Sequence, residues 1–242
     1  MQWMSYTVVE LKNFYRNVSQ AFFVGVMPLF YFLIFAWANR NSARAFTFIV
    51  PGALGLMILM TMLVNQANTI AIQRSRLLLK RLRGTPLKPL TLITGKIAIS
   101  LGVLILQTAV ILIFTSSVFH QKFMLNWPTF ILVFLVSCVI FAFLGFALAN
   151  LIPNADSAVA ITNVVMFVLF ILSIPGFTGL HLGKILTLLS HIDPVTYLMM
   201  GLRDSYTGSP FDLSHAFQYI VVGIWVIGGV YLAVARFRWD ER

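Results

Sequence analysis

Residues 73–96 read QRSRLLLKRLRGTPLKPLTLITGK, and they form the only long charged segment of an otherwise strongly apolar chain. Seven of the 17 Lys and Arg residues lie in this stretch, with no Asp or Glu among them. Leu78, Leu79 and Leu82 recur at helical spacing, which predicts a short amphipathic helix that ends at Gly84. Long uncharged runs flank the stretch, so we expect a cytoplasmic hairpin between two membrane spans. It either offers a helix to a protein outside the bilayer or is only a positive-inside topology signal.

The composition is that of an integral membrane protein. Hydrophobic residues make up 60% of the chain and charged residues only 10%, whereas about a quarter of the residues of a soluble domain are charged. The net charge of +10 fits positive-inside loops and anionic lipid headgroups better than nucleic acid, because the basic residues flank apolar runs. Cys138 is the only cysteine, which excludes a disulfide framework within the chain and a site built from several thiolates.

The hydrophobic pattern predicts an all-α membrane protein with a single transmembrane domain over residues 1–242. Six uncharged runs of span length lie at residues 19–38, 46–70, 97–119, 129–151, 158–175 and 216–235. With both termini in the cytoplasm, the inner segments hold 12 Lys and Arg and the outer segments five, which favours that orientation. Before the first span, residues 1–16 predict an interfacial amphipathic helix or a plain extension of the span, and no cleavable signal.

Two further segments carry information. Residues 175–214 begin with Pro175-Gly176-Phe177 and stay too apolar for a free outer loop, so we expect a pair of short helices that dip into the outer leaflet. Within the spans, Asn65 and Asn68 share a helix face, and Asn163 lies in the fifth span. Such amides form either interhelical hydrogen bonds or a polar substrate path. The spans carry no mid-span charge, which argues against a proton- or ion-coupled pump.

Motifs for catalysis, nucleotides and metals are missing from the sequence. Gly95-Lys96 lacks the remaining residues of a phosphate-binding loop, and the four histidines show no metal-ligand spacing. Asp193, Asp204 and Asp212 have no Ser, Cys or His at a recognisable catalytic spacing. We therefore expect no enzyme activity in this chain and no cofactor bound by it.

The order of motifs resembles the permease subunit of type-2 ABC exporters, in their drug-export-like branch. The hairpin carries Leu79-Lys80-Arg81-Leu82-Arg83-Gly84-Thr85-Pro86-Leu87, and Gly95-Lys96 opens the third span, as in that family. Asp193-Pro194-Val195-Thr196-Tyr197 and Gly201-Leu202-Arg203 resemble the family signature before the last span. The likeness covers nearly the whole chain.

This resemblance implies roles for three groups of residues. It makes the hairpin a coupling helix that docks on a separate ATP-binding subunit, and that subunit would hold the ATP and Mg²⁺. The coupling residues of the hairpin would be Arg74, Arg76, Leu78, Leu79, Leu82 and Arg83. In a dimer of two permeases, which are homo- or heterodimers in the family, it places these residues on a central path: Asn65, Asn68, Asn163, Met166 and Phe167. The outer re-entrant segment would include Pro175, Gly176, Phe177, Asp193, Pro194, Tyr197 and Arg203. Gln73 and Ser75 replace the family's acids and Leu77 its glycine, so we expect docking through leucines instead of acid–arginine pairs.

These observations predict an exporter permease in a bacterial plasma membrane that moves an amphipathic, drug-like or lipid-like substrate out of the cell. A polysaccharide or glycolipid exporter is the second hypothesis, although a glycan path would need more Trp and Tyr for stacking and more polar residues than these spans contain. A lipid-acting enzyme is a third, and it would use His181 and Asp193 at the outer face. A passive channel or scaffold would need no ATPase partner.

Overall fold

The structure, a computed structural model, describes residues 22–75, 89–180, 183–209 and 216–235. All regular secondary structure in these residues is helical, as the sequence predicts. In chain order the helices are η1 (Phe22–Val26), α3 (Met27–Ala38), α4 (Ala43–Ile58), η2 (Leu59–Val64), α5 (Asn65–Ser75), α7 (Pro89–Ser117), α8 (Trp127–Leu151), α9 (Ala155–Thr178), α10 (Lys184–Ser190), α11 (Pro194–Tyr206) and α12 (Ala216–Ala235). α4, η2 and α5 follow one another without a break, and we call them together the long helix.

Among the described residues, four helices are long and apolar enough to cross a membrane, namely Ala43–Ser75, Thr94–Ser117, Trp127–Leu151 and Ala155–Thr178. They correspond to the second to fifth predicted spans. The pair α10 and α11, bent by 74°, would make a fifth crossing if it counts as one span. The apolar helix Val24–Ala38 is shorter, and α12 coincides with the sixth predicted span. The six-span topology therefore stays a prediction.

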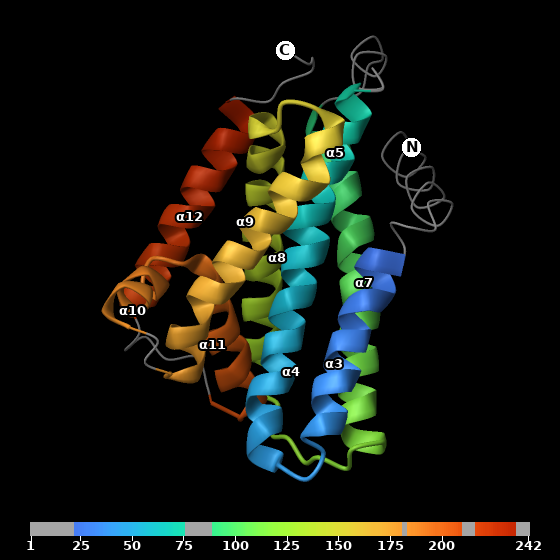
Figure 1. Ribbon diagram of the computed structural model, residues 1–242, viewed down its shortest axis with the longest axis vertical. Helices are drawn as coiled ribbons and strands as arrows, with labels where there is room; N and C mark the ends of the chain where they lie inside the picture. Colours follow the sequence, from blue (N-terminus) through green and yellow to red (C-terminus); the bar gives the residue numbers. More distant parts are fainter. Residues whose placement is uncertain (1–21, 76–88, 181–182, 210–215, 236–242) are drawn as a thin grey trace.

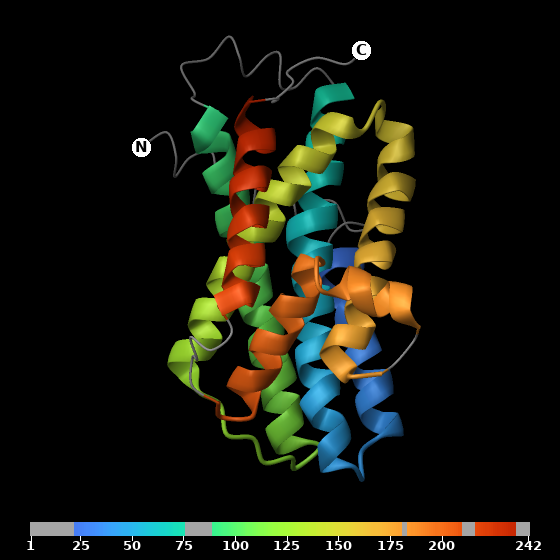
Figure 2. The ribbon, with the colours of Figure 1, turned by 90° about the vertical axis from the view of Figure 1, so that its left-hand side faces the viewer.

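The long helix, α3, α7, α8, α9 and α12 run along the long axis of the molecule (Figure 1). The end of α5 and the short turn between α8 and α9 lie at the same end of the bundle (Figures 1 and 2). The turn between α3 and α4 lies at the opposite end, and α11 packs in that half of the molecule (Figures 1 and 2). The end of α5 and the helix α11 of the outer segment thus lie in opposite halves of the molecule.

In the described part of the chain, side-chain oxygens cap the start of four helices. Ser42 accepts a hydrogen bond from the backbone N–H of Ala45 at 3.3 Å, and Asn126 accepts one from Thr129 at 3.3 Å. Asn154 and Asp193 cap α9 and α11 in the same way. Each cap satisfies an N–H group that the first turn of a helix leaves without a partner, which explains why these helices begin where they do.

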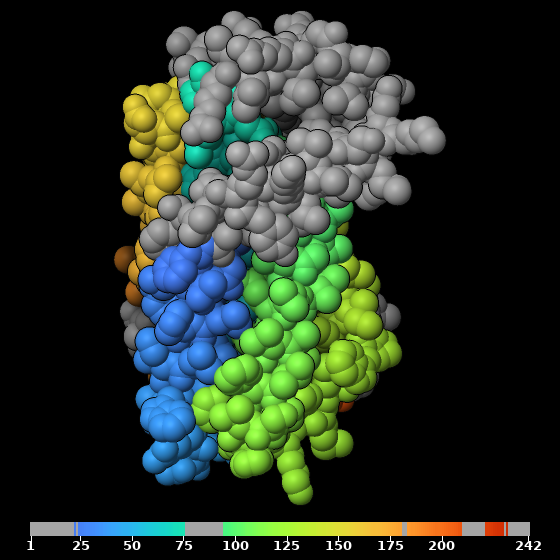
Figure 3. All heavy atoms as spheres, turned by 90° about the vertical axis from the view of Figure 1, so that its right-hand side faces the viewer, coloured from blue at the N-terminus to red at the C-terminus, as the bar shows by residue number. Residues whose placement is uncertain are grey.

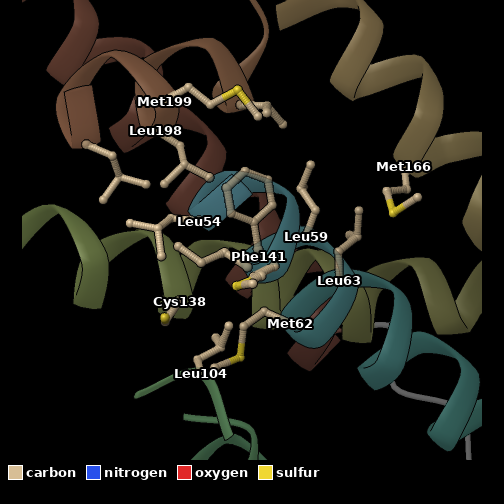
Figure 4. Packing of buried hydrophobic residues seen from close by; sticks show 14 of the residues in the cluster. Leu54, Leu59, Met62, Leu63, Leu104, Cys138, Phe141, Met166, Leu198 and Met199 are labelled. Carbon is tan, nitrogen blue, oxygen red and sulfur yellow. The ribbon is translucent and has the colours of Figure 1, made fainter. Parts of the chain in front are cut away.

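The core lies where the long helix, α8 and α11 meet. Leu54, Met62, Phe141 and Leu198 from these helices are almost completely buried and point toward one another (Figure 4). Lipid tails are as apolar as these side chains, so close van der Waals packing rather than exclusion of water holds such helices together. A glycine allows α8 to approach the backbone of η2 closely: a Cβ at Gly145 of α8 would lie 2.6 Å from the Met62 carbonyl oxygen.

A proline in the first apolar helix is compensated from α7. Pro28 has no N–H, so the carbonyl group of Val24, four residues earlier, lacks its helical donor. The side-chain Nε2 of Gln107 donates to the carbonyl oxygens of Val24 at 2.7 Å and Gly25 at 2.9 Å. Gln107 is 3% exposed. This amide of α7 therefore forms hydrogen bonds to another helix.

The outward surface is apolar. α3 and α7 lie side by side on one face of the molecule (Figure 3). Ile34 and Phe35 of α3 and Leu106 of α7 are more than half exposed. A surface of this kind suits contact with lipid.

Candidate transport path and coupling region

Polar side chains join three helices in the half of the bundle that holds the end of α5. Gln66 of α5 donates from Nε2 to the hydroxyl oxygen of Ser100 in α7 at 2.8 Å. The Thr162 hydroxyl group of α9 lies 3.0 Å from Oδ1 of Asn68 in α5 and 2.8 Å from the Ala158 carbonyl oxygen of its own helix. These contacts satisfy groups that would otherwise face hydrocarbon. They attach α5 to both α7 and α9.

The five residues expected on a central path do not share one surface in this chain. Asn65 is buried and accepts a hydrogen bond from Thr69 at 3.4 Å. Asn163 is half-buried and donates to the Val159 carbonyl oxygen of its own helix at 2.8 Å. Met166 is fully buried (Figure 4), whereas the neighbouring Phe167 is 54% exposed.

Arg74 is the one residue of the expected coupling set that the described part of the chain includes. It lies in the last turn of α5 and is 2% exposed. Its guanidinium group donates to the carbonyl oxygens of Ala149 at 3.1 Å and Ile152 at 2.5 Å, at the end of α8. The side chain therefore points into the bundle rather than out toward another protein. The other members lie outside the described residues: Arg76, Leu78, Leu79, Leu82 and Arg83.

The outer segment contains the expected pair of short helices, at shifted boundaries. Pro175, Gly176 and Phe177 belong to the last turn of α9, which continues to Thr178 and ends at Gly179 in a left-handed conformation. The fifth span is thus longer than the predicted 158–175, because Pro175 is accommodated inside the helix. The two short helices are α10 and α11, which come after this turn.

The bend between α10 and α11 is held by three side chains. Asp193 accepts hydrogen bonds through Oδ2 from the backbone N–H of Thr196 at 3.0 Å and from its hydroxyl group at 3.1 Å. The Tyr197 hydroxyl group donates to the His191 carbonyl oxygen at 2.7 Å. Trp225 of α12 donates to the Ile192 carbonyl oxygen at 2.8 Å. Pro194 occupies the first turn of α11, where its missing N–H costs nothing.

Arg203 connects three helices in the same half of the molecule. Its guanidinium carbon lies 4.2 Å from the ring centre of Phe48 in α4. Its Nη1 is 3.4 Å from the Phe177 carbonyl oxygen, in the last turn of α9. A cation at a helix C-terminus interacts favourably with the helix dipole. Arg203 thus stabilises the packing of α11 against α4 and α9.

A sequence model of the family described as ABC-2 type transporter matches residues 1–207. The chain belongs to the ABC-2 type transporter family. It is a permease component of an ABC transporter, a multi-pass membrane protein whose family associates with an ATP-binding subunit. A search of curated proteins found no match to the chain. The predicted resemblance is confirmed at the level of the family.

Two observations bear on the hypothesis of a lipid-acting enzyme. The described part of this ABC-2 permease contains no group of three or more His, Cys, Asp or Glu residues that could hold a metal ion. The Asp193 carboxylate, which a lipid-acting enzyme would need, caps α11. His181, the other residue of that hypothesis, lies outside the described residues.

Sequence reasoning missed two contacts of this transporter. Ser100 was not singled out, because a lone serine in an apolar helix gives no pattern. The inward direction of Arg74 was also missed, because the charge of the hairpin made a surface role more plausible. The sequence carries one signal: Pro153 cannot donate to the Ala149 carbonyl group, so another donor is needed there.

Proposed function

We propose that this ABC-2 permease is the transmembrane subunit of an exporter that moves an amphipathic or hydrophobic substrate, drug-like or lipid-like, out of the cell. A separate ATP-binding subunit supplies the energy and holds ATP and Mg²⁺. The complete exporter consists of two permease chains and two such subunits. In this arrangement the chain has six spans, with both termini in the cytoplasm of a bacterial cell.

The observation that supports this proposal best is the exposed side of α9. In the apolar 18-residue stretch of α9, only 22% is buried within the chain, whereas 56% of the corresponding stretch of the long helix is buried. The exposed residues Val164, Phe167 and Ile171 recur along one side of α9. A second permease chain opposite this side would enclose a path between two copies of α9.

The chemistry of that path indicates the substrate class. α9 carries no Lys, Arg or Glu, and its one Asp lies in its first turn. The polar groups near the path are neutral amides and hydroxyls, of which Asn68 and Thr162 already bond to each other. Apolar groups can enter such a path at a low free-energy cost, and the path offers no fixed charge that would bind an ion. It favours amphipathic molecules over glycans.

The proposal is tested by substrate uptake into inside-out membrane vesicles that contain the permease and its ATP-binding subunit. We expect ATP-dependent uptake of Hoechst 33342, a hydrophobic dye, and a loss of uptake in Phe167→Asp. Ile34→Asp, which adds the same charge to an exposed site on α3, serves as the control and should lower uptake far less.

If the vesicles take up a labelled lipid-linked glycan but not the dye, the substrate is a glycan rather than a drug-like molecule. Failure of any ATP-dependent movement in a complex that hydrolyses ATP would contradict an export function.

A further inference from the structure

The end of α8 is a helix terminus that its own backbone cannot complete. In a continuing helix the carbonyl group of Ala149 would accept a hydrogen bond from residue 153, which is Pro153 and has no N–H. Ile152, just after α8, has an extended backbone with φ −74° and ψ 122°, as is usual before a proline. The carbonyl groups of Ala149 and Ile152 therefore depend on donors from elsewhere.

Arg74 supplies those donors from α5. Its two terminal nitrogens bond one carbonyl group each, and its positive charge lies at the negative end of the α8 dipole. The fork of a guanidinium group suits two acceptors at once, which an ammonium group on a lysine cannot match. Arg74 thus joins the end of α5 to the end of α8 by a two-point contact.

The turn between α8 and α9 is short and firmly attached. Ile152, Pro153 and Asn154 are the only residues between the two helices, and the Asn154 side chain caps α9 by accepting from the Ser157 N–H at 2.9 Å. The same α5 also touches α9 through Asn68 and Thr162. The beginning of α9 is therefore connected to α5 through two independent sets of contacts.

We propose that Arg74 is a positioning residue through which movement of the basic hairpin reaches the turn between α8 and α9. The hairpin continues directly from α5, so a push on it by the ATP-binding subunit moves the end of α5. Arg74 then carries the end of α8, and with it the start of α9, in the same direction. This inference rests on the proposed function and assigns Arg74 to transmission inside the permease, not to the surface that docks on the partner.

The test is hydrogen–deuterium exchange, followed by mass spectrometry, on the permease assembled with its ATP-binding subunit. Exchange at residues 154–160 is compared between the nucleotide-free complex and the complex trapped with ATP and vanadate. The variants are Arg74→Gln and Arg74→Lys. Arg44→Gln is the matched control, because Arg44 is an exposed arginine at the opposite end of the same long helix.

We expect a difference in exchange between the two nucleotide states in the wild type and in Arg44→Gln. The difference should be roughly fivefold smaller in Arg74→Gln and roughly twofold smaller in Arg74→Lys, which keeps the charge but loses the fork. A merely structural role would raise exchange equally in both nucleotide states and leave the difference unchanged.

An exchange difference between the two nucleotide states that is as large in Arg74→Gln as in the wild type would overturn the inference. If Arg74→Gln does not assemble, Arg74→Lys decides, and a full wild-type difference there would overturn it. A wild-type complex that hydrolyses ATP without any change at residues 154–160 would also overturn it, while leaving the permease function intact. A wild-type chain that binds no ATP-binding subunit would instead refute the proposed function.

Discussion

Two prolines show how single side chains complete the helices of this transporter. Pro28 and Pro153 each deprive a carbonyl group one turn earlier of its donor, and a polar side chain from another helix replaces it. Gln107 serves the first and Arg74 the second. In a membrane such a carbonyl group finds no water, so the replacement donor contributes to both stability and helix placement.

We expect Gln107→Leu to lower the free energy of unfolding by about 1–3 kcal/mol, because it leaves the carbonyl group of Val24 unsatisfied in an apolar environment. Thermal or denaturant unfolding of the detergent-solubilised protein measures the change. Gln121→Leu is the control, since Gln121 bonds the Arg40 carbonyl group at an exposed site where water can take its place. Equal decreases in unfolding free energy in the two variants would show that the buried hydrogen bonds of Gln107 contribute no more than the exposed ones of Gln121.

Gly145 makes a prediction at the same scale. A methyl group there would lie 2.6 Å and 2.7 Å from the carbonyl oxygens of Met62 and Leu63, so Gly145→Ala must push α8 away from η2. We expect a loss of about 1–3 kcal/mol in unfolding free energy from this overpacking.

The control for Gly145 is Gly102→Ala, because Gly102 is also a helical glycine but has nothing within 4 Å of an added Cβ. It should remain within about 1 kcal/mol of the wild type. If Gly145→Ala unfolds at the same temperature as Gly102→Ala, α8 and η2 do not pack as closely as described.

At the scale of elements, α11 depends on its first residues. The Asp193 side chain caps it, and we expect Asp193→Ala to cost about 1 kcal/mol of unfolding free energy through loss of that cap. Asp193→Asn should cost only a few tenths, about 0.5 kcal/mol at most, since asparagine caps as well as aspartate. The same denaturation experiment measures both. An asparagine variant as unstable as the alanine variant would mean that the negative charge, not the acceptor, matters.

The sequence was sufficient to predict which segments are helical and apolar. The second, third and fourth predicted spans fall within or largely overlap the long helix, α7 and α8, because each is a long uncharged run. Boundaries were less predictable where tertiary contacts decide them. α7 begins at Pro89, earlier than the predicted residue 97, and α9 continues through Pro175.

The directions of side chains could not be predicted from spacing alone. Asn68 and Asn163 were both plausible path residues, yet Asn68 bonds α9 and Asn163 bonds its own helix. Met166 and Phe167 are neighbours on α9 and point to opposite environments. Which side of a helix faces its own bundle is decided by the packing of all its neighbours, and an apolar sequence leaves that choice open.

At the scale of the whole molecule, the two ends of the bundle differ in what holds them together. Arg74, Gln66 and Asn68 connect helices at the α5 end. Arg203, Asp193 and Trp225 connect them in the half that holds α11. Between these polar contacts lies an apolar core. This distribution fits a permease driven at one end by a partner and opened at the other.

The central claim is that the basic hairpin docks on a separate ATP-binding subunit through the residues that follow α5, numbers 76–83. The most direct measurement is co-purification of that subunit with the permease from mild detergent, compared between the wild type and the double variant Leu79→Asp, Leu82→Asp. Met124→Asp, which adds charge to an exposed loop residue near α8, is the control. We predict that an ATPase co-purifies with the wild type and the control and is lost from the double variant. An ATPase retained by the double variant, or absent from the wild type, would contradict the account.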